Sequence, residues 1–335
     1  MSVLEKFVSY KFVDSDGELR DKIVRPGKGL EQTWFDGSSF GFCDTNKSDL
    51  LLVPDESTSH FDPIRNMKGV FCFLRDPQGN KLETDFRTQV AKLRDTNEQT
   101  KGALFGVEPE FFVLQKSDNY RTELPLGIET HDQLGAVEQG EWYGALPPVD
   151  CFQDLRNEIV EALDEAGFSI EGVHHEVAPG QAEISWKCAD ILTTCDKMLL
   201  FRYIVKAICA KHNYRASFEA KPFKNLNGSG CHTHQSTPAM RDKLNGEDAL
   251  AKYAQGLIDH YDELVKVCCT GKTSLQRLTP GYEAPTKENN GIGWHDRTKT
   301  VRIPGRGQRL EYRLPDPEMN PYLALSSMLK FGLGL

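Results

Sequence analysis

The sequence lacks the features that mark an exported, membrane-spanning or nucleic-acid-binding chain. No amino-terminal segment places basic residues before an apolar stretch, and the apolar runs are far too short to cross a bilayer. The 40 basic residues against 49 acidic ones leave a formal charge of −9, which argues against a surface that holds nucleic acid or anionic lipid. We therefore expect a cytoplasmic protein that binds neither nucleic acid nor a membrane.

Cysteine occurs nine times, but in no pattern that predicts disulfides or a zinc site. The residues are scattered, form no CxxC unit and are adjacent only at Cys268 and Cys269. Reduced thiols that act as small core hydrophobes are typical of this usage. The rest of the composition, 39% hydrophobic and 27% charged over 335 residues, predicts a globular chain with room for a large core and two domains.

Two glutamates share one face of a strand-like segment, residues 106–114 (GVEPEFFVL). Pro109 suits a strand start or an edge strand. Because side chains alternate along a strand, Glu108 and Glu110 point the same way, about 7 Å apart. The segment is either a half-exposed strand with a polar face or one half of a site for a divalent cation, since Mg²⁺ and Mn²⁺ prefer carboxylate ligands.

The chain before this segment predicts a small sheet domain. Residues 7–13, 49–53 and 69–74 are strand-like runs between turns. Asp36, in the stretch WFDGSSF, starts a turn that Gly37 permits, and a turn residue is its simplest interpretation.

Helices and strands alternate in the rest of the chain. Asp150 and Gln153 form a capping-box pair before a helix that ends near Gly167. Pro179-Gly180 predicts a turn between two strands in residues 173–186. A surface excursion is expected over residues 115–143, a final strand over 309–315, and further helices over 84–97, 190–212, 246–268 and from 321 onward. Asp190 is expected to cap the helix over 190–212.

Acidic and imidazole side chains recur on these strands. His174 and Glu176 share a face of one hairpin arm, and His232 and His234 share a face after the glycine-bearing turn in NGSGCHTHQS. A lone strand histidine is more often a hydrogen-bonded core residue than a ligand. Together, five carboxylates and one imidazole provide ligands for two divalent cations: Glu108, Glu110, Glu176, Glu183, His232 and Glu311.

Arginines cluster in the same carboxyl-terminal part of the sequence, at positions 277, 297, 302, 309 and 313. Arginine forks match phosphate and carboxylate oxygens, and metals that bridge phosphates recur in phosphoryl transfer. The residues predict a metal- and nucleotide-dependent transferase or ligase for an anionic small molecule. Arginine and glutamate also form surface networks of little energy, which is the competing interpretation.

The chain resembles glutamine synthetase from about residue 12 to its end. The motifs that carry the resemblance are, in order, WFDGSSF, DLLLVPD, GVEPEFFVL, PPVD, HHEVAPGQAE, NGSGCHTHQS, RLTPGYEAP, VRIP and RLEYRLPDPEMNPYLAL. The resemblance implies an α+β fold, with an amino-terminal β-grasp domain in residues 1–83. Residues 84–335 are then the catalytic domain, a curved antiparallel sheet that forms an open funnel backed by helices. It also implies a homo-oligomer of two stacked rings, a decamer or a dodecamer, with active sites at subunit interfaces.

Carried over residue by residue, the resemblance implies the following roles. One metal is held by Glu110, Glu176 and Glu183, and a second by Glu108, His232 and Glu311. Glutamate and ammonium are bound by Ser39, Tyr143, Glu176, Asn227, Gly228, Arg277 and Arg313. ATP is bound by His234, Ser236, Arg302 and Arg309, and the catalytic residues are Asp36, Glu283 and Arg297.

The implied reaction uses ATP and two or more Mg²⁺ or Mn²⁺ ions to join ammonium to the side-chain carboxylate of glutamate. Attack on the γ-phosphate gives γ-glutamyl phosphate, Asp36 then takes a proton from ammonium, and ammonia displaces phosphate. Asp36 is donated across the subunit interface, and Glu283 lies on a flap that keeps water from the intermediate.

The sequence departs from the family pattern at two places. Residues 286–295 are about two residues longer than expected, and the chain ends without the bacterial extension that carries an adenylylated tyrosine, so that regulation is expected to be absent. A γ-glutamyl ligase for a larger amine and an inactive, structural family member remain alternatives to glutamine synthesis.

Overall fold

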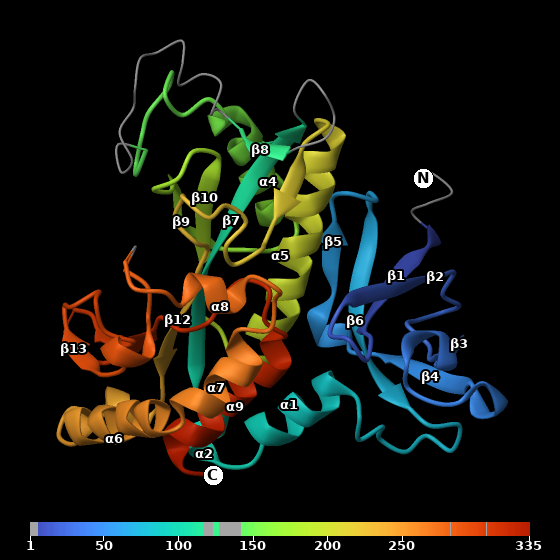
Figure 1. The fold of residues 1–335 in the computed structure, drawn as a ribbon. Helices are drawn as coiled ribbons and strands as arrows, with labels where there is room; N and C mark the ends of the chain where they lie inside the picture. The colour runs from blue at the N-terminus through green and yellow to red at the C-terminus, as the bar shows by residue number, and fades with distance from the viewer. Residues whose placement is uncertain (1–5, 117–122, 127–141, 282, 306) are drawn as a thin grey trace.

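The computed structural model describes residues 6–116, 123–126, 142–281, 283–305 and 307–335 (Figure 1). The first part of the chain forms a six-stranded sheet in the order β2-β1-β6-β4-β3, with β5 paired to β6. The expected strands at 7–13, 49–53 and 69–74 are confirmed. The six strands are β1 (Val8–Val13), β2 (Leu19–Val24), β3 (Thr33–Asp36), β4 (Asp49–Pro54), β5 (His60–Asp62) and β6 (Met67–Arg75).

A second, nine-stranded sheet follows, in the order β13-β14-β15-β12-β7-β10-β9, with β8 and β11 also paired to β7. Every pair in it is antiparallel except β13 with β14, and the expected curved sheet backed by helices is confirmed (Figure 1). Its strands are β7 (Leu104–Lys116), β8 (Glu123–Pro125), β9 (Ile170–His175), β10 (Gln181–Trp186), β11 (Arg215–Ser217), β12 (Cys231–Ser236), β13 (Ile292–Trp294), β14 (Val301–Ile303) and β15 (Leu310–Tyr312).

The prediction that Pro109 marks a strand start or an edge is wrong, because β7 lies in the middle of the sheet. β12 pairs with β7 as far as Pro109, and β10 pairs with it from Glu110 onward. A proline has no N–H to donate to a ladder. Pro109 is accommodated because it stands at the residue where the paired neighbour of β7 changes.

Helices pack against the second sheet and against one another. The predicted Asp190 cap is confirmed, since its side chain accepts hydrogen bonds from the backbone N–H groups of Leu192 and Thr193. Among the described residues, no helix is both long and apolar enough to cross a membrane. The α-helices are α1 (Phe86–Arg94), α2 (Glu98–Lys101), α4 (Gln153–Glu165), α5 (Ile191–Lys211), α6 (Gly246–Asp259), α7 (Tyr261–Cys268), α8 (Ser274–Arg277) and α9 (Pro321–Leu333).

Two helix predictions are wrong in detail. Asp150 does not cap α4, whose N-cap is Phe152 without a side-chain bond, because Asp150 instead forms a buried ion pair with Arg156. The single helix expected over 246–268 is broken at His260, whose ring stacks on Phe331 at 4.2 Å. Most of the surface excursion expected over 115–143 lies outside the described residues.

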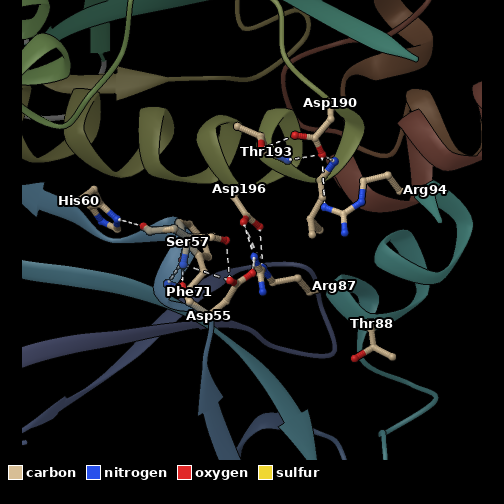
Figure 2. A network of polar contacts seen from close by, with 12 residues as sticks. Asp55, Ser57, His60, Phe71, Arg87, Thr88, Arg94, Asp190, Thr193 and Asp196 are labelled. Atoms are coloured by element: carbon tan, nitrogen blue, oxygen red, sulfur yellow. Dashed lines mark hydrogen bonds and ion pairs between the residues drawn. The ribbon is translucent and has the colours of Figure 1, made fainter. Parts of the chain in front are cut away.

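A buried ionic contact joins the part of the chain that forms the first sheet to the part that forms the second sheet (Figure 2). Arg87 on α1 donates to Asp55, which follows β4, at 2.8 Å, and to Asp196 on α5 at 2.9 Å. Tyr322 on α9 donates to the same Asp196 carboxylate. The guanidinium also lies 4.2 Å from the centre of the Phe73 ring on β6. Arg87 therefore ties one side of the first sheet to the helices behind the second.

Candidate functional site

A cavity of about 760 Å³ opens on one face of the second sheet. Most of the residues that the sequence marks as functional line it, although they come from segments far apart in the chain. Those in the lining are Glu108, Glu110, Tyr143, Glu176, Glu183, Asn227, Gly228, His232, His234, Arg277, Glu283, Arg297, Arg302, Arg309 and Arg313.

Strand register explains why the ligand-type side chains meet. Residues directly opposite each other on neighbouring strands share one face of the sheet. Glu183 on β10 is opposite Glu110 on β7, and His232 on β12 is opposite Glu108. Glu311 on β15 is opposite His234, which extends the same face to a further strand. The alternation seen in the sequence therefore becomes one acidic surface across four strands.

This acidic surface is crowded and buried. Burial, with Glu108 and Glu110 nearby, raises the pKa of Glu183 to about 10. Burial and the neighbouring Glu176 also raise the pKa of Glu110. Carboxylates in this state bind a proton or a cation, because neither the low dielectric nor their mutual repulsion tolerates several bare charges. The donor set therefore fits hard divalent cations.

The side chains that lie close enough to share an ion differ from the implied ligand sets. One group, with ligand atoms within 4.8 Å of one another, is Glu108, Glu183 and His232. A second is His174, Glu176 and Glu183, so Glu183 belongs to both. The implied division into two ligand sets stays a prediction.

Glu311 and Glu110 are held by other side chains. Glu311 is 1% exposed, receives hydrogen bonds from Arg302 and Arg313, and lies 3.7 Å from Nδ1 of His232. Glu110 accepts a hydrogen bond of 2.9 Å from Gln181. Each carboxylate is therefore oriented before any cation arrives, which is how supporting hydrogen bonds tune a metal site.

His234 connects the acidic group to the arginines. Its Nδ1 accepts from Nε of Arg309 at 3.2 Å, so the proton of the neutral ring lies on Nε2, which donates to Glu108 at 3.0 Å. Burial opposes ionisation of Glu108, but this bond and the positive charges of Arg297 and Arg302 lower its pKa overall. Glu108 is thus ionised beside Glu183, which holds its proton.

Glu283 occupies a strained position at the rim of the cavity. Its φ of 55° is in the left-handed region that non-glycine residues rarely adopt. The carboxylate is exposed and lies 3.7 Å from a guanidinium nitrogen of Arg313.

Four of the predicted residues are outside the lining of this cavity, and Glu311, which bonds Arg302 and Arg313 of the lining, is one of them. Asp36 and Ser39 are on the first sheet and its following turn, outside the cavity lining, and Ser39 donates to the Asp36 carboxylate. Ser236 lines a smaller adjoining cavity of about 380 Å³, which shares His234 and Arg309 with the first. The placement of Asp36 and Ser39 means that one chain alone does not bring them to the acidic surface.

Sequence reasoning gave no role to His174, Lys221 and Gln181. Nε2 of His174 is hydrogen-bonded to Oε1 of Glu176 at 2.9 Å, and its place two residues before Glu176 was a usable signal. Lys221 lines the cavity. Gln181 is fully buried and its side-chain amide also contacts the Gly228 carbonyl at 3.2 Å, a contact that no sequence pattern announces.

Comparisons with known proteins show that nearly the whole chain is similar to glutamine synthetases. Residues 85–334 match the family model described as the glutamine synthetase catalytic domain, and residues 5–77 match the glutamine synthetase β-grasp domain. Proteins named glutamine synthetase from Thermus thermophilus and Methanocaldococcus jannaschii are 39% and 35% identical. Each of these alignments covers 98% of this chain and 76% of the relative. A glutamine synthetase from Methanosarcina mazei is 37% identical over 98% of the chain and 75% of its own length.

Proposed function

Because the chain belongs to the glutamine synthetase family, we propose that it ligates ammonium to the γ-carboxylate of L-glutamate with ATP, through γ-glutamyl phosphate, giving L-glutamine, ADP and phosphate. The proposal rests on one observation. The acidic surface and five arginines line the same cavity: Arg277, Arg297, Arg302, Arg309 and Arg313. We place this reaction in the cytoplasm. We also propose that the β-grasp domain ends at residue 83 and that the catalytic domain begins at residue 84.

The acidic side would hold two or more Mg²⁺ or Mn²⁺ ions through Glu108, Glu110, Glu176, Glu183, His232 and Glu311. Bound there, the ions would neutralise the ATP phosphates and polarise the γ-phosphoryl group. Arg302 and Arg309, with His234 and Ser236, bind the nucleotide, and Arg297 stabilises the charge that grows on the transferred phosphoryl group.

Glutamate lies on the opposite side, between Asn227, Gly228, Arg277 and Arg313. Arg277 is 8% exposed, and among the described residues its guanidinium donates to the backbone carbonyls of Leu314 and Arg313 and forms no ion pair with a side-chain carboxylate. Glu110 and Asp316 interact with its charge at longer range, so it can still pair directly with a substrate carboxylate. Gly228 leaves no room for a side chain, because a Cβ there lies 2.7 Å from the Ala220 carbonyl oxygen. Glu283 closes this end of the cavity and excludes water from the acyl phosphate.

The ammonium pocket is completed by a second subunit. Tyr143 and Glu176 belong to the cavity of one chain, and Asp36 with Ser39 comes from the β-grasp domain of its neighbour in a ring, within a decamer or dodecamer of two stacked rings. Hydrogen bonds from Ser38 and Ser39 lower the pKa of Asp36. The carboxylate is therefore ionised at neutral pH, as attraction of a small cation requires.

The proposal is tested by measuring phosphate release with magnesium, ATP and glutamate, with and without ammonium. We expect ammonium-dependent phosphate release matched mole for mole by glutamine. Absence of ammonium-dependent release contradicts the proposal, and faster release with methylamine or a polyamine than with ammonium assigns the chain to a larger amine instead.

Replacing Asp36 by alanine should impair amide formation more than phosphoryl transfer. Loss of a base that accepts a proton from ammonium costs about 10²–10⁴-fold in that step. The comparison is ammonium-dependent glutamine formation against ammonium-independent phosphate release. Asp49→Ala is the control, because Asp49 is an exposed carboxylate directly opposite Asp36 on β4. Equal losses in both steps for Asp36→Ala count against its role as the ammonium base.

Binding of a divalent cation should release a proton from Glu183. Its folded-state pKa of about 10 lies above the ordinary glutamate value of 4.5, so the metal-free chain is stabilised by the bound proton at low pH and loses that stability as pH rises from there toward 10. A cation needs the ionised carboxylate, so Mn²⁺ affinity should rise about tenfold per pH unit for one released proton.

Calorimetry of Mn²⁺ binding in two buffers with different ionisation enthalpies measures this release. Glu183→Gln should lower the release by one proton and leave any contribution of Glu110, whereas replacement of Glu171, an exposed glutamate on β9, by glutamine should not change it. An Mn²⁺ affinity of the unmodified chain that does not change between pH 6 and pH 8 would rule out a protonated Glu183.

A further inference from the structure

A separate cavity of about 360 Å³ lies between helix α5 and the turn that joins β1 to β2. Figure 1 shows α5 running beside the first sheet, and this cavity shares no lining residue with the one proposed as the active site. It lies instead where the β-grasp part of the chain meets the catalytic part. Its lining includes Arg202, Tyr203, Lys206 and Ala207 from α5, and Glu18 and Leu19 from the turn and β2.

Arg202 is a buried cation that forms no ion pair with a carboxylate of the described residues, although three carboxylates act on its charge from farther away. It is 9% exposed, its Nη2 donates to the Met319 carbonyl at 2.6 Å, and its Nε has no hydrogen-bond partner among the described residues. By contrast, buried Arg87 and Arg156 each form an ion pair with an aspartate. Burial lowers the pKa of Arg202, and the charges of Glu18, Asp316 and Glu318 offset this only in part.

Arg277 is a useful comparison. It is also buried, and its guanidinium also bonds only to backbone carbonyls, yet it lines the active-site cavity as a proposed ligand of the substrate carboxylate. A buried arginine of this kind destabilises the fold unless something neutralises it, and a bound anion does so. Arg202 is in the same state at a second cavity.

The rest of the cavity wall favours a small anion with an organic part. Lys206 is one turn after Arg202, so the two cationic side chains share a face of α5. The Tyr203 hydroxyl donates to Asp62 at 3.3 Å, which fixes its ring as an apolar edge beside Leu19 and Ala207. Glu18 is the one carboxylate in the lining, so two cations face a single anion.

We propose that this cavity binds a small oxyanion, a carboxylate or a phosphate, held by Arg202 and Lys206. Charge-assisted hydrogen bonds from a guanidinium and an ammonium suit either group, and partial burial strengthens them. Because the walls come from both parts of the chain, the bound anion bridges the first sheet and α5. This site is independent of the proposed glutamine synthesis.

The test is calorimetric titration of the assembled protein with inorganic phosphate and, separately, with succinate. The proposed active-site cavity should also bind these anions, so two classes of sites are expected. The informative class is the one whose affinity changes between variants. Lys206→Gln should weaken one class of sites about tenfold, since one charge-assisted contact contributes roughly 1.4 kcal/mol. Arg202→Gln should remove that class, and Glu18→Gln should strengthen it because the opposing carboxylate loses its charge.

Lys211→Gln is the matched control, because it removes the same charge from the same helix at a residue that bonds Glu158 instead. It should leave both classes of sites unchanged. Lys206 is exposed, so we expect Lys206→Gln to fold, and this variant still tests the proposal if Arg202→Gln fails to fold. Tighter binding of phosphate than of succinate identifies a phosphate ligand, and the reverse an organic carboxylate. Identical isotherms for the unmodified chain and Lys206→Gln with both probes overturn the proposal.

Discussion

Replacing Glu311 by glutamine is expected to lower turnover by at least about a thousandfold without unfolding the chain. Glutamine preserves the volume and one oxygen but removes the negative charge. Glu311 is 1% exposed and lies between Arg302 and Arg313, which belong to the proposed ATP and glutamate sites. One carboxylate thus orients two arginines that serve different substrates, and its loss should disturb both sites at once.

The same carboxylate is also proposed to bind a divalent cation, and the two roles can be separated. Paramagnetic titration with Mn²⁺ counts the bound ions per chain. If Glu311 is a ligand, the variant should bind one ion fewer at concentrations that saturate the unmodified chain. If it acts only through Arg302 and Arg313, the count should stay the same while the KM values for ATP and glutamate rise.

A suitable control is Glu318→Gln. Glu318 follows the same strand and is half-buried, and its carboxylate accepts a hydrogen bond from the Ala220 backbone at 3.1 Å. Among the described residues, Glu318 neither lines the active-site cavity nor, unlike Glu311, bonds an arginine that does. Its variant should retain turnover within about threefold, as expected for a substitution away from the reacting groups. Near-normal turnover of Glu311→Gln would contradict both proposed roles of this carboxylate, as a metal ligand and as the partner of Arg302 and Arg313.

The sequence predicted the acidic face because strand alternation is a local property. Glu108 and Glu110 are two residues apart on one strand, so their common direction follows from the period of two alone. The register that places Glu183 opposite Glu110 is set by the whole sheet and had to be observed. The helix cap at Asp190 was predictable for the same local reason, since its partners lie within three residues.

Predictions failed where a side-chain contact outside the expected pattern outweighs a local preference. Asp150 satisfies the capping pattern, yet its ion pair with Arg156 fixes it elsewhere, and His260 breaks a continuous helical pattern because its ring stacks on Phe331. The grouping of His174 with Glu176 and Glu183 depends on three side-chain positions that no spacing determines. The roles of the individual site residues and the domain boundary stay predictions.

Arg87 gives the second large expected effect. Its replacement by methionine should destabilise the chain by about 3–5 kcal/mol, because it leaves buried carboxylates without their cation. Arg87 is fully buried and donates through Nε and Nη2 to Asp196, which is 109 residues away, and also to Asp55. Asp196 is only 4% exposed, so water does not replace the lost partner. Since this contact joins β4 to α5, the loss should also loosen the two parts of the chain from each other (Figure 2).

The pH dependence identifies the cause of this destabilisation. Burial already raises the pKa of Asp196 with Arg87 present, and removal of the cation should raise it further. A carboxylate with a raised folded-state pKa is stabilising below its unfolded pKa and loses that contribution as pH rises. The difference in unfolding free energy between Arg87→Met and the unmodified chain should therefore be larger at pH 8 than at pH 5.

Chemical denaturation at both pH values and at fixed protein concentration measures these differences. Asp196→Asn in the Arg87→Met background should recover part of the stability, because the unpaired charge is gone. Arg94→Met is the control on the same helix: Arg94 pairs with Asp95 and Asp190 at the surface, and such pairs contribute at most about 1 kcal/mol. A loss for Arg87→Met no larger than that of Arg94→Met would show that the buried pair does not hold the two parts of the chain together.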